Sequence, residues 1–221
     1  MECTINSNDL LNLSHKFNST ITVFLVSLLI YSFKSELSTK DFKRYIKIDI
    51  PVDLRKYFKS TSSKNFFGLT SVNYKFKNES DTLEDIIKEV NKQFKENITK
   101  EKLSERVNLM ISFEKNIFCR FTPIFIKNYI LKIIDYFTSQ MCTTCLSNIG
   151  IIKLEKDLED YIKNISVLTS TNNFQFTICS FKENLVIGIS SKYKYNNIIK
   201  NFLRLLSNYN LNIKVDFNEV D

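Results

Sequence analysis

The sequence predicts an α/β fold in which a mixed sheet packs against helices. Short segments alternate apolar and polar residues with the period of a half-buried strand, and longer segments repeat apolar residues at helical spacing. Hydrophobic residues make up 43% of the 221 residues, which is enough to build a buried core. Because no repeat, low-complexity linker or shift in composition divides the chain, we expect one domain over residues 1–221.

The first half of the chain is expected to mix helices and strands. Asn8 and Asp9 supply capping groups for the first helix, and the apolar run Ile21–Phe33 predicts a core helix that is covered on several sides. Asp81, with Glu84 three residues later, is expected to cap a further helix. We expect a flexible segment at residues 1–7, helices at 8–17, 20–33 and from 81 onward, and strands at 45–52 and 67–76.

Strands are expected to be more frequent in the second half of the chain. Pro123 suits the first turn of a long helix, where the missing N–H of proline costs nothing. The segment Lys182-Glu-Asn184 has the length of a hairpin loop. In order, we expect helices near 100–114 and 123–139, a strand at 143–149, a small helix near 155–163, strands at 165–170, 174–181 and 185–191, a helix at 195–208 and a strand at 211–217.

The composition excludes several classes of nucleotide and nucleic-acid site. The chain has 3 Gly, so neither a Gly-x-Gly-x-x-Gly loop nor a Walker-type loop can be written in it. The net charge is +7, but only five basic residues are Arg, the residue that suits bidentate phosphate recognition. We therefore do not expect nucleic acid to be the main partner. Binding of nucleic acid or an anionic membrane through the lysines is a third hypothesis.

The five cysteines favour free thiols in a reducing compartment. Their number is odd, and the first residues lack the pattern of a signal peptide, so we expect a cytoplasmic protein. Cys142-Thr-Thr-Cys145 has the spacing of a metal or redox pair, but the chain offers no second pair of ligands for zinc, and we expect no metal site. The most apolar run, Ile21–Phe33, has 13 residues where a membrane span needs about 20, so we expect no span.

Five short motifs follow one another in a recognisable order between about residues 8 and 218. They are Thr20-Ile-Thr22, Ile50-Pro-Val-Asp-Leu-Arg55-Lys-Tyr-Phe58, Asn65-Phe-Phe-Gly68, Glu114-Lys-Asn-Ile-Phe-Cys-Arg120 and Ser147-Asn-Ile-Gly150. Together they make the chain resemble the C-terminal lobe of an alcohol acetyltransferase-like member of the condensation and chloramphenicol acetyltransferase-like acyltransferase superfamily. The resemblance implies a single lobe of an α/β sandwich, with helices packed on a mixed sheet.

The resemblance also implies six positions at the acyl-transfer tunnel or at the interface between the lobes. They are Arg55, Asn65, Gly68, Ser147, Asn148 and Gly150. Each position also has a purely structural interpretation. Arg55 can pair with Asp53 in a turn, which is the role we favour for it, and the two glycines can serve a strand start and a bulge. For the other positions both interpretations stay open.

The catalytic base of this superfamily has no counterpart in the chain. By resemblance, a His-His-x-x-x-Asp-Gly motif on the N-terminal lobe would supply an imidazole, whose pKa suits proton transfer near neutral pH. The chain contains a single histidine, His15, and no Asp stands four residues after it. We therefore expect no catalytic residue in this chain, no stably bound cofactor, and acyl-CoA only as a co-substrate.

These observations lead to a principal hypothesis and an alternative. The chain is expected to be the C-terminal half of an acyl-CoA-dependent O-acyltransferase that forms one wall of the tunnel and is inactive alone. Its partner would be the missing N-terminal lobe on a separate chain, or a second copy in a homodimer. The alternative is a non-catalytic interaction protein that uses the former lobe interface to bind a partner or itself.

Overall fold

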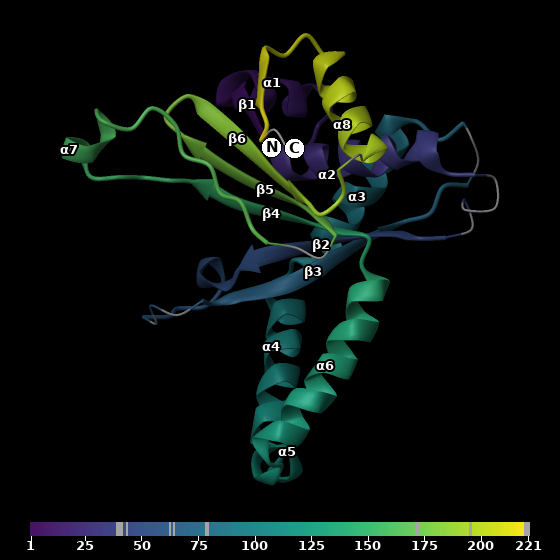
Figure 1. Ribbon diagram of the computed structural model, residues 1–221, viewed down its shortest axis with the longest axis vertical. Coiled ribbons are helices and arrows are strands. Elements are labelled where there is room, and N and C mark those ends of the chain that lie inside the picture. The colour runs from purple at the N-terminus through teal and green to yellow at the C-terminus, as the bar shows by residue number, and fades with distance from the viewer. Residues whose placement is uncertain are drawn as a thin grey trace.

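The computed structural model of the chain has a mixed sheet at its centre (Figure 1). It describes the whole chain except residues 39–41, 43, 62, 64, 78–79, 171–172, 195 and 219–221, and except the side chains of residues 114, 118, 119, 139 and 140. The described strands are β1 (Glu2–Asn6), β2 (Ile46–Asp53), β3 (Phe67–Tyr74), β4 (Thr144–Ile151), β5 (Phe174–Phe181), β6 (Asn184–Ser191) and β7 (Ile213–Asp216). The described helices are α1 (Ser7–Lys16), α2 (Ile21–Phe33), α3 (Leu83–Asn97), α4 (Lys100–Lys115), α5 (Ile117–Phe121), α6 (Ile124–Met141), α7 (Lys156–Glu159) and α8 (Asn197–Ser207).

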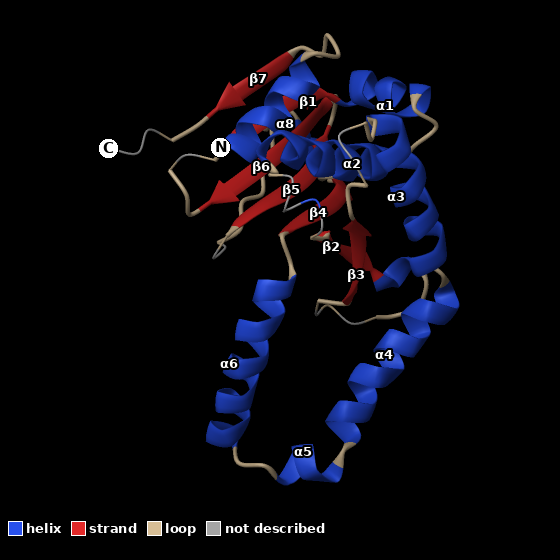
Figure 2. Ribbon diagram, turned by 90° about the vertical axis from the view of Figure 1, so that its right-hand side faces the viewer, coloured by secondary structure: helices blue, strands red, loops and turns tan. Residues whose placement is uncertain are grey.

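The strands form one sheet in the order β3-β2-β4-β5-β6-β1-β7. β4 runs parallel to both β2 and β5, and the other neighbouring pairs are antiparallel. The helices α2, α3 and α8 cover one face of this sheet (Figure 2). The predicted α/β class is therefore confirmed. Both parallel pairs have long crossover connections, through β3 and helices α3 to α6 between β2 and β4, and through the segment that contains α7 between β4 and β5.

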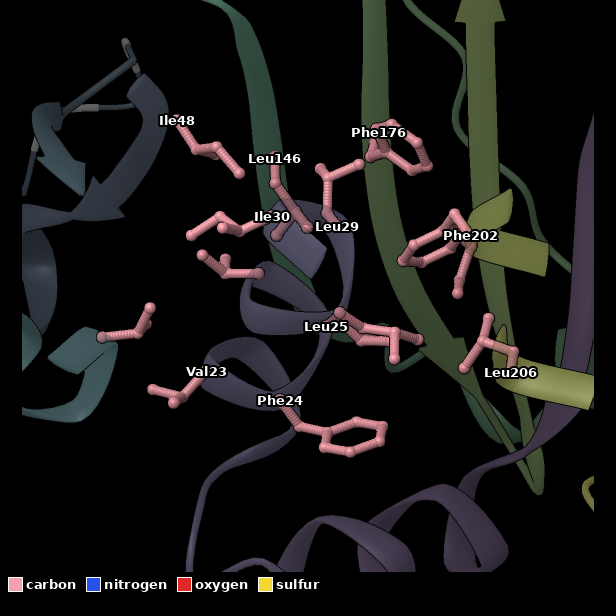
Figure 3. Close-up of a cluster of buried hydrophobic side chains, with 14 of the residues drawn as sticks. Val23, Phe24, Leu25, Leu29, Ile30, Ile48, Leu146, Phe176, Phe202 and Leu206 are labelled. Atoms are coloured by element: carbon pink, nitrogen blue, oxygen red, sulfur yellow. The ribbon is translucent and has the colours of Figure 1, made fainter. Parts of the chain in front are cut away.

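Helix α2 is the centre of the hydrophobic core. Phe24, Leu25, Leu28, Leu29 and Ile30 are completely buried. In Figure 3 the side chains of this helix point in several directions, toward Ile48 and Leu146 of the sheet and toward Phe202 and Leu206 of α8. The helix also has buried hydroxyls, and these are satisfied because Ser27 and Ser32 donate to carbonyl oxygens one turn earlier, at 2.8 and 2.6 Å. The sequence prediction of a helix covered on several sides is confirmed.

The cap of α3 lies one residue later than the sequence predicts. Thr82 is the N-cap, and it forms a capping box with Asp85. Asp81 instead accepts hydrogen bonds from the Tyr74 hydroxyl at 3.0 Å and from the Lys77 backbone N–H at 2.9 Å. Burial and the neighbouring Asp81 carboxylate both raise the pKa of Tyr74, so the phenol stays protonated and remains the donor. Asp81 therefore joins the end of β3 to the start of α3.

Two segments of the backbone differ from the expectation. Residues 1–7 were expected to be flexible, but Glu2–Asn6 form β1, which pairs with β6 on one side and β7 on the other. Alternation explains this strand, because Cys3 and Ile5 point into the core. The expected strand at 165–170 is wrong, since these residues form no ladder in the structure.

Residues 164–168 instead cross the second face of the sheet as an extended strap. The Ser166 hydroxyl donates to Glu2 Oε1 at 2.6 Å, and the Cys179 thiol donates to the Ile165 carbonyl at 3.3 Å. The strap also lies directly on Gly188 of β6, where an added Cβ would come within 2.3 Å of the Val167 carbonyl oxygen. The strap therefore covers the part of this face that β1, β5 and β6 form.

The helices α4, α5 and α6 form an arm, residues 100–141, that projects away from the sheet (Figure 2). Leu103 is buried at the base of α4, and the Arg106 guanidinium donates to the Leu69 carbonyl of β3 at 2.8 Å. At the other end of the arm, the Thr143 N–H donates to the Lys47 carbonyl at 2.9 Å. Helices at 100–114 and 123–139 were predicted, but the sequence does not indicate that they leave the core.

Replacing Gly188 by alanine tests whether the strap is seated on β6. The new Cβ cannot avoid the Val167 carbonyl unless the strap moves, so we expect Gly188→Ala to lower the free energy of unfolding by about 1–3 kcal/mol. Urea denaturation followed by circular dichroism measures this change.

Gly68→Ala is the matched control, because its Cβ would meet only the flexible Leu54 side chain, at 3.3 Å. The control should change stability much less than Gly188→Ala. Equal effects of the two substitutions would contradict a strap held against the backbone of β6.

Candidate functional site

A small cleft of about 220 Å³ lies at the carboxyl ends of the parallel strands β2 and β4. Clefts at the carboxyl ends of parallel strands are common ligand sites, because connecting loops diverge there. The first turn of α2 and the last turn of α3 close its sides. The cleft is lined by Thr22, Ile50, Pro51, Val52, Asp53, Lys56, Tyr57, Phe94, Ile98, Asn148, Ile149 and Gly150.

Asn148 holds the β4 side of the cleft together. Its Nδ2 donates to Thr22 Oγ1 at 2.8 Å, and its Oδ1 accepts from the Gly150 N–H at 2.9 Å. Gly150 has a φ of +86°, a conformation that glycine adopts without strain, and the pairing of β4 with β5 shifts register between Asn148 and Gly150. The bulge therefore ties the end of β4 to the first turn of α2.

The turn after β2 forms the opposite wall. Asp53 caps a short 3-10 helix by accepting the Arg55 backbone N–H at 3.0 Å, and the Arg55 guanidinium lies 3.8 Å from the same carboxylate. Both side chains are largely open to solvent, at 40% and 46% exposure, so this ion pair contributes little to stability. Lys56 and Tyr57 follow in this turn and reach the cleft.

The six positions implied by the resemblance do not converge on one point. Asn148 and Gly150 line the cleft, whereas Arg55 lies in the exposed turn beside it. Gly68 pairs with Val52 in the sheet, and Asn65 is exposed just before β3. Ser147 is half-buried on the opposite side of β4 from Asn148.

Several cleft residues were missed at the sequence level, although a signal for some of them exists. Thr22 and Tyr57 belong to motifs that carry the resemblance, and their motifs point to this region. Phe94 and Ile98 appear in the sequence only as the end of an amphipathic stripe. Nothing in that periodicity indicates which end of α3 meets the end of β4.

The chemistry of the cleft is suited to binding and orientation. Its side chains offer a hydroxyl, a carboxylate, an ammonium, a phenol and an amide beside an apolar wall, and none of the lining residues is a histidine. His15, the only histidine of the sequence, is exposed in the last turn of α1. A small polar group with an apolar substituent could be held here by hydrogen bonds, but the cleft supplies no imidazole base.

The cysteine pair at the start of β4 is not activated. Burial raises the pKa of Cys142 to about 12, with the Asp49 carboxylate adding to the effect, and burial raises the pKa of Cys145 to about 11. The Cys142 thiol donates to the Thr144 carbonyl at 3.1 Å. Within the described residues no cluster of three or more His, Cys, Asp or Glu side chains could hold a metal ion.

The raised pKa values predict slow alkylation of these thiols. At pH 8 a thiol with a pKa of about 11 is ionised in about one molecule per thousand, and the thiolate is the reactive form. We expect iodoacetamide to label Cys142 and Cys145 at least 100-fold more slowly in the folded chain than in urea, as read by peptide mass spectrometry. Rapid labelling of either thiol at pH 8 would show a reactive cysteine instead.

Replacement of Asn148 tests its role as the link between β4 and α2. Asn148→Ala removes both hydrogen bonds, and we expect it to lower the free energy of unfolding by about 1–2 kcal/mol. Thermal or urea denaturation measures the loss. Ser147→Ala, the control on the other side of the same strand, should have a much smaller effect, and an equal effect would contradict the proposed link.

No family model matches the sequence, and no curated protein matches it. Solved structures match its fold. They include the epimerization domain from the third module of tyrocidine synthetase B, with a TM-score of 0.57 and 12% identity, and a condensation domain for chain release from the enacyloxin polyketide synthase, with a TM-score of 0.56 and 5% identity. A third is the trichothecene 15-O-acetyltransferase from Fusarium sporotrichioides, with a TM-score of 0.52 and 12% identity.

The matches cover nearly all of this chain but only part of each solved structure. The three matches cover 95%, 94% and 95% of this chain but only 47%, 40% and 46% of the larger chains, in the same order. The chain thus spans less than half the length of these structures. It has the α/β fold of the condensation-domain and chloramphenicol acetyltransferase-like acyltransferases, over an extent that corresponds to a single lobe.

Proposed function

We propose that this chain is the C-terminal lobe of an acyl-CoA-dependent O-acyltransferase of the alcohol acetyltransferase type and works with a separate lobe that carries the catalytic histidines. The observation that carries the proposal is the half-length match, in which nearly the whole chain aligns with less than half of each larger structure. The single histidine of the sequence agrees with a lobe that lacks the base.

In this proposal the cleft between β2 and β4 forms part of the acceptor side of the tunnel. The partner lobe would supply the imidazole that takes the proton of the alcohol, whose oxygen then attacks the thioester carbonyl and releases the CoA thiol. Asn148, Tyr57 and Thr22 would orient the polar groups of the substrate, and Phe94 with Ile98 would contact its apolar part. The chain itself would exclude water and position the reactants.

Exposed apolar groups near the sheet edge support a protein partner at this side. Phe67 and Leu69 of β3 are 53% and 47% exposed, and Ile149 of β4 is 50% exposed. The strap covers the β1, β5 and β6 side of the second face and leaves these residues open. A second lobe placed against β3 and the end of β4 would bury them.

A complementation assay tests the proposed function. We expect the chain alone to release no CoA thiol from acetyl-CoA and a short-chain alcohol, because no lining residue of the cleft is a histidine. Addition of a lobe that bears His-His-x-x-x-Asp-Gly, from an adjacent reading frame or a known alcohol acetyltransferase, should restore release. A free-thiol assay follows the reaction, and a lobe with both histidines replaced by alanine is the control.

Two results would contradict the proposal. Steady-state release of CoA by the isolated chain, lost in Arg55→Ala or Asn148→Ala, would place the catalytic machinery in this lobe. A tight complex with the histidine-bearing lobe that stays inactive with every acyl donor would instead favour the alternative, a non-catalytic interaction protein with the same fold.

A further inference from the structure

The arm, residues 100–141, holds most of the apolar surface that the molecule exposes. Within the described residues 29 large apolar side chains are exposed, and 17 of them belong to the arm. Exposure rises toward the far end, where Phe121, Ile124 and Phe125 are 78%, 74% and 70% exposed. Scattered apolar residues are normal on a protein surface, but a concentration of this size on one projecting segment marks a contact surface.

Helix α6 is amphipathic, but its apolar half does not pack extensively against the described helices and strands. At 100° per residue, nine of the ten apolar residues from Phe125 to Met141, all except Leu131, occupy roughly half of the helix circumference. Lys127, Lys132 and Asp135 lie on the other half. The helix makes no extensive contact with any other described helix or strand, so its apolar half is open along its length.

The charges of the outer arm are almost all positive. Residues 115–134 contain Lys115, Arg120, Lys127 and Lys132 and no Asp or Glu. The Lys127 side chain is half-buried, and its ammonium donates to the Arg120 carbonyl of α5 at 3.5 Å. In this segment Lys and Arg side chains stand beside exposed Phe, Ile and Leu side chains, with no carboxylate between them. Such a surface complements one that carries anionic groups above an apolar layer.

This combination fits a bilayer surface better than a protein surface. Lysine is depleted in the buried part of protein interfaces, whereas interfacial helices pair a half-circumference apolar face with a lysine-bearing polar face. Nucleic acid would contact the cations but leave the aromatic side chains in water. No single helix in the described part of the chain is long and apolar enough to cross a membrane.

We propose that the arm docks the protein on an anionic lipid surface. The apolar half of α6 and the side chains of Ile117 and Phe121 in α5 enter the boundary between headgroups and acyl chains. Arg120, Lys127 and Lys132 meet the phosphate and carboxylate groups of the lipids.

Because Leu103 and Arg106 fasten α4 to β3, docking leaves the sheet and the cleft outside the bilayer. This inference does not depend on the proposed acyltransferase function.

Vesicle flotation with the full chain tests the proposal. We use vesicles of phosphatidylcholine alone and of phosphatidylcholine with about one-third phosphatidylserine. We expect at least tenfold tighter binding to the anionic vesicles, weakened by high salt. The pair Phe121→Ser and Phe125→Ser should weaken binding at least tenfold, and so should the pair Arg120→Ser and Lys132→Ser.

Matched pairs outside the arm serve as controls. Leu158→Ser with Tyr161→Ser removes two exposed apolar groups, and Lys153→Ser with Lys156→Ser removes two exposed charges. Both pairs should bind vesicles as the parent chain does, and circular dichroism should show all variants folded.

Three outcomes would overturn the proposal. They are equal binding to neutral and anionic vesicles, vesicle binding that the arm variants leave unchanged, and no vesicle binding at all. If vesicles do not bind but light scattering shows a dimer that Phe121→Ser with Phe125→Ser converts to a monomer, the arm binds a second copy. If only the histidine-bearing lobe binds the arm, its occupant is that lobe. Either result replaces the lipid surface with a protein.

Discussion

The burial of α2 is the constraint on which the rest of the structure depends. A helix of 13 residues that is apolar nearly all round cannot face water on any side, so the sheet, α3 and α8 must enclose it together. Deleting a single leucine from such a core costs about 2–5 kcal/mol, a large part of the stability of a domain. The position of α2 also sets the cleft, because Thr22 in its first turn receives the hydrogen bond from Asn148.

The two faces of the sheet are used differently. One face carries the helices and the core, whereas the second is covered on the β1, β5 and β6 side by a strap that donates and accepts its own hydrogen bonds. Around β3 the second face stays open, with Phe67 exposed and the base of the arm attached at Leu69, whereas the cleft lies at the strand ends beside α2 and α3.

Much of the fold could be predicted because its signals are local. Strand alternation and helical spacing depend only on neighbouring residues, and they located α2, β2, β5, β6 and α8 within a few positions. The errors have physical causes. The alternation in Glu2–Asn6 covers only five residues, a short signal for a strand that pairs with both β6 and β7 in the structure. The alternating residues 165–170 join no ladder because they cross above strands rather than beside them. For the site, Asn148 and Gly150 stand two residues apart in one motif, but Thr22, which accepts the hydrogen bond of Asn148, lies 126 residues away from it.

The order of residues alone was sufficient for the α/β class, for the central position of α2 and for the lack of a catalytic histidine motif, since each of these follows from composition and short spacing. Other properties needed the folded chain. Which face of the sheet stays open, which side chains meet at the ends of β2 and β4, and whether α4 and α6 join the core or leave it all depend on contacts between distant segments. An amphipathic pattern shows that a helix needs an apolar neighbour, and only the packed structure shows that α6 packs extensively against none of the described helices and strands.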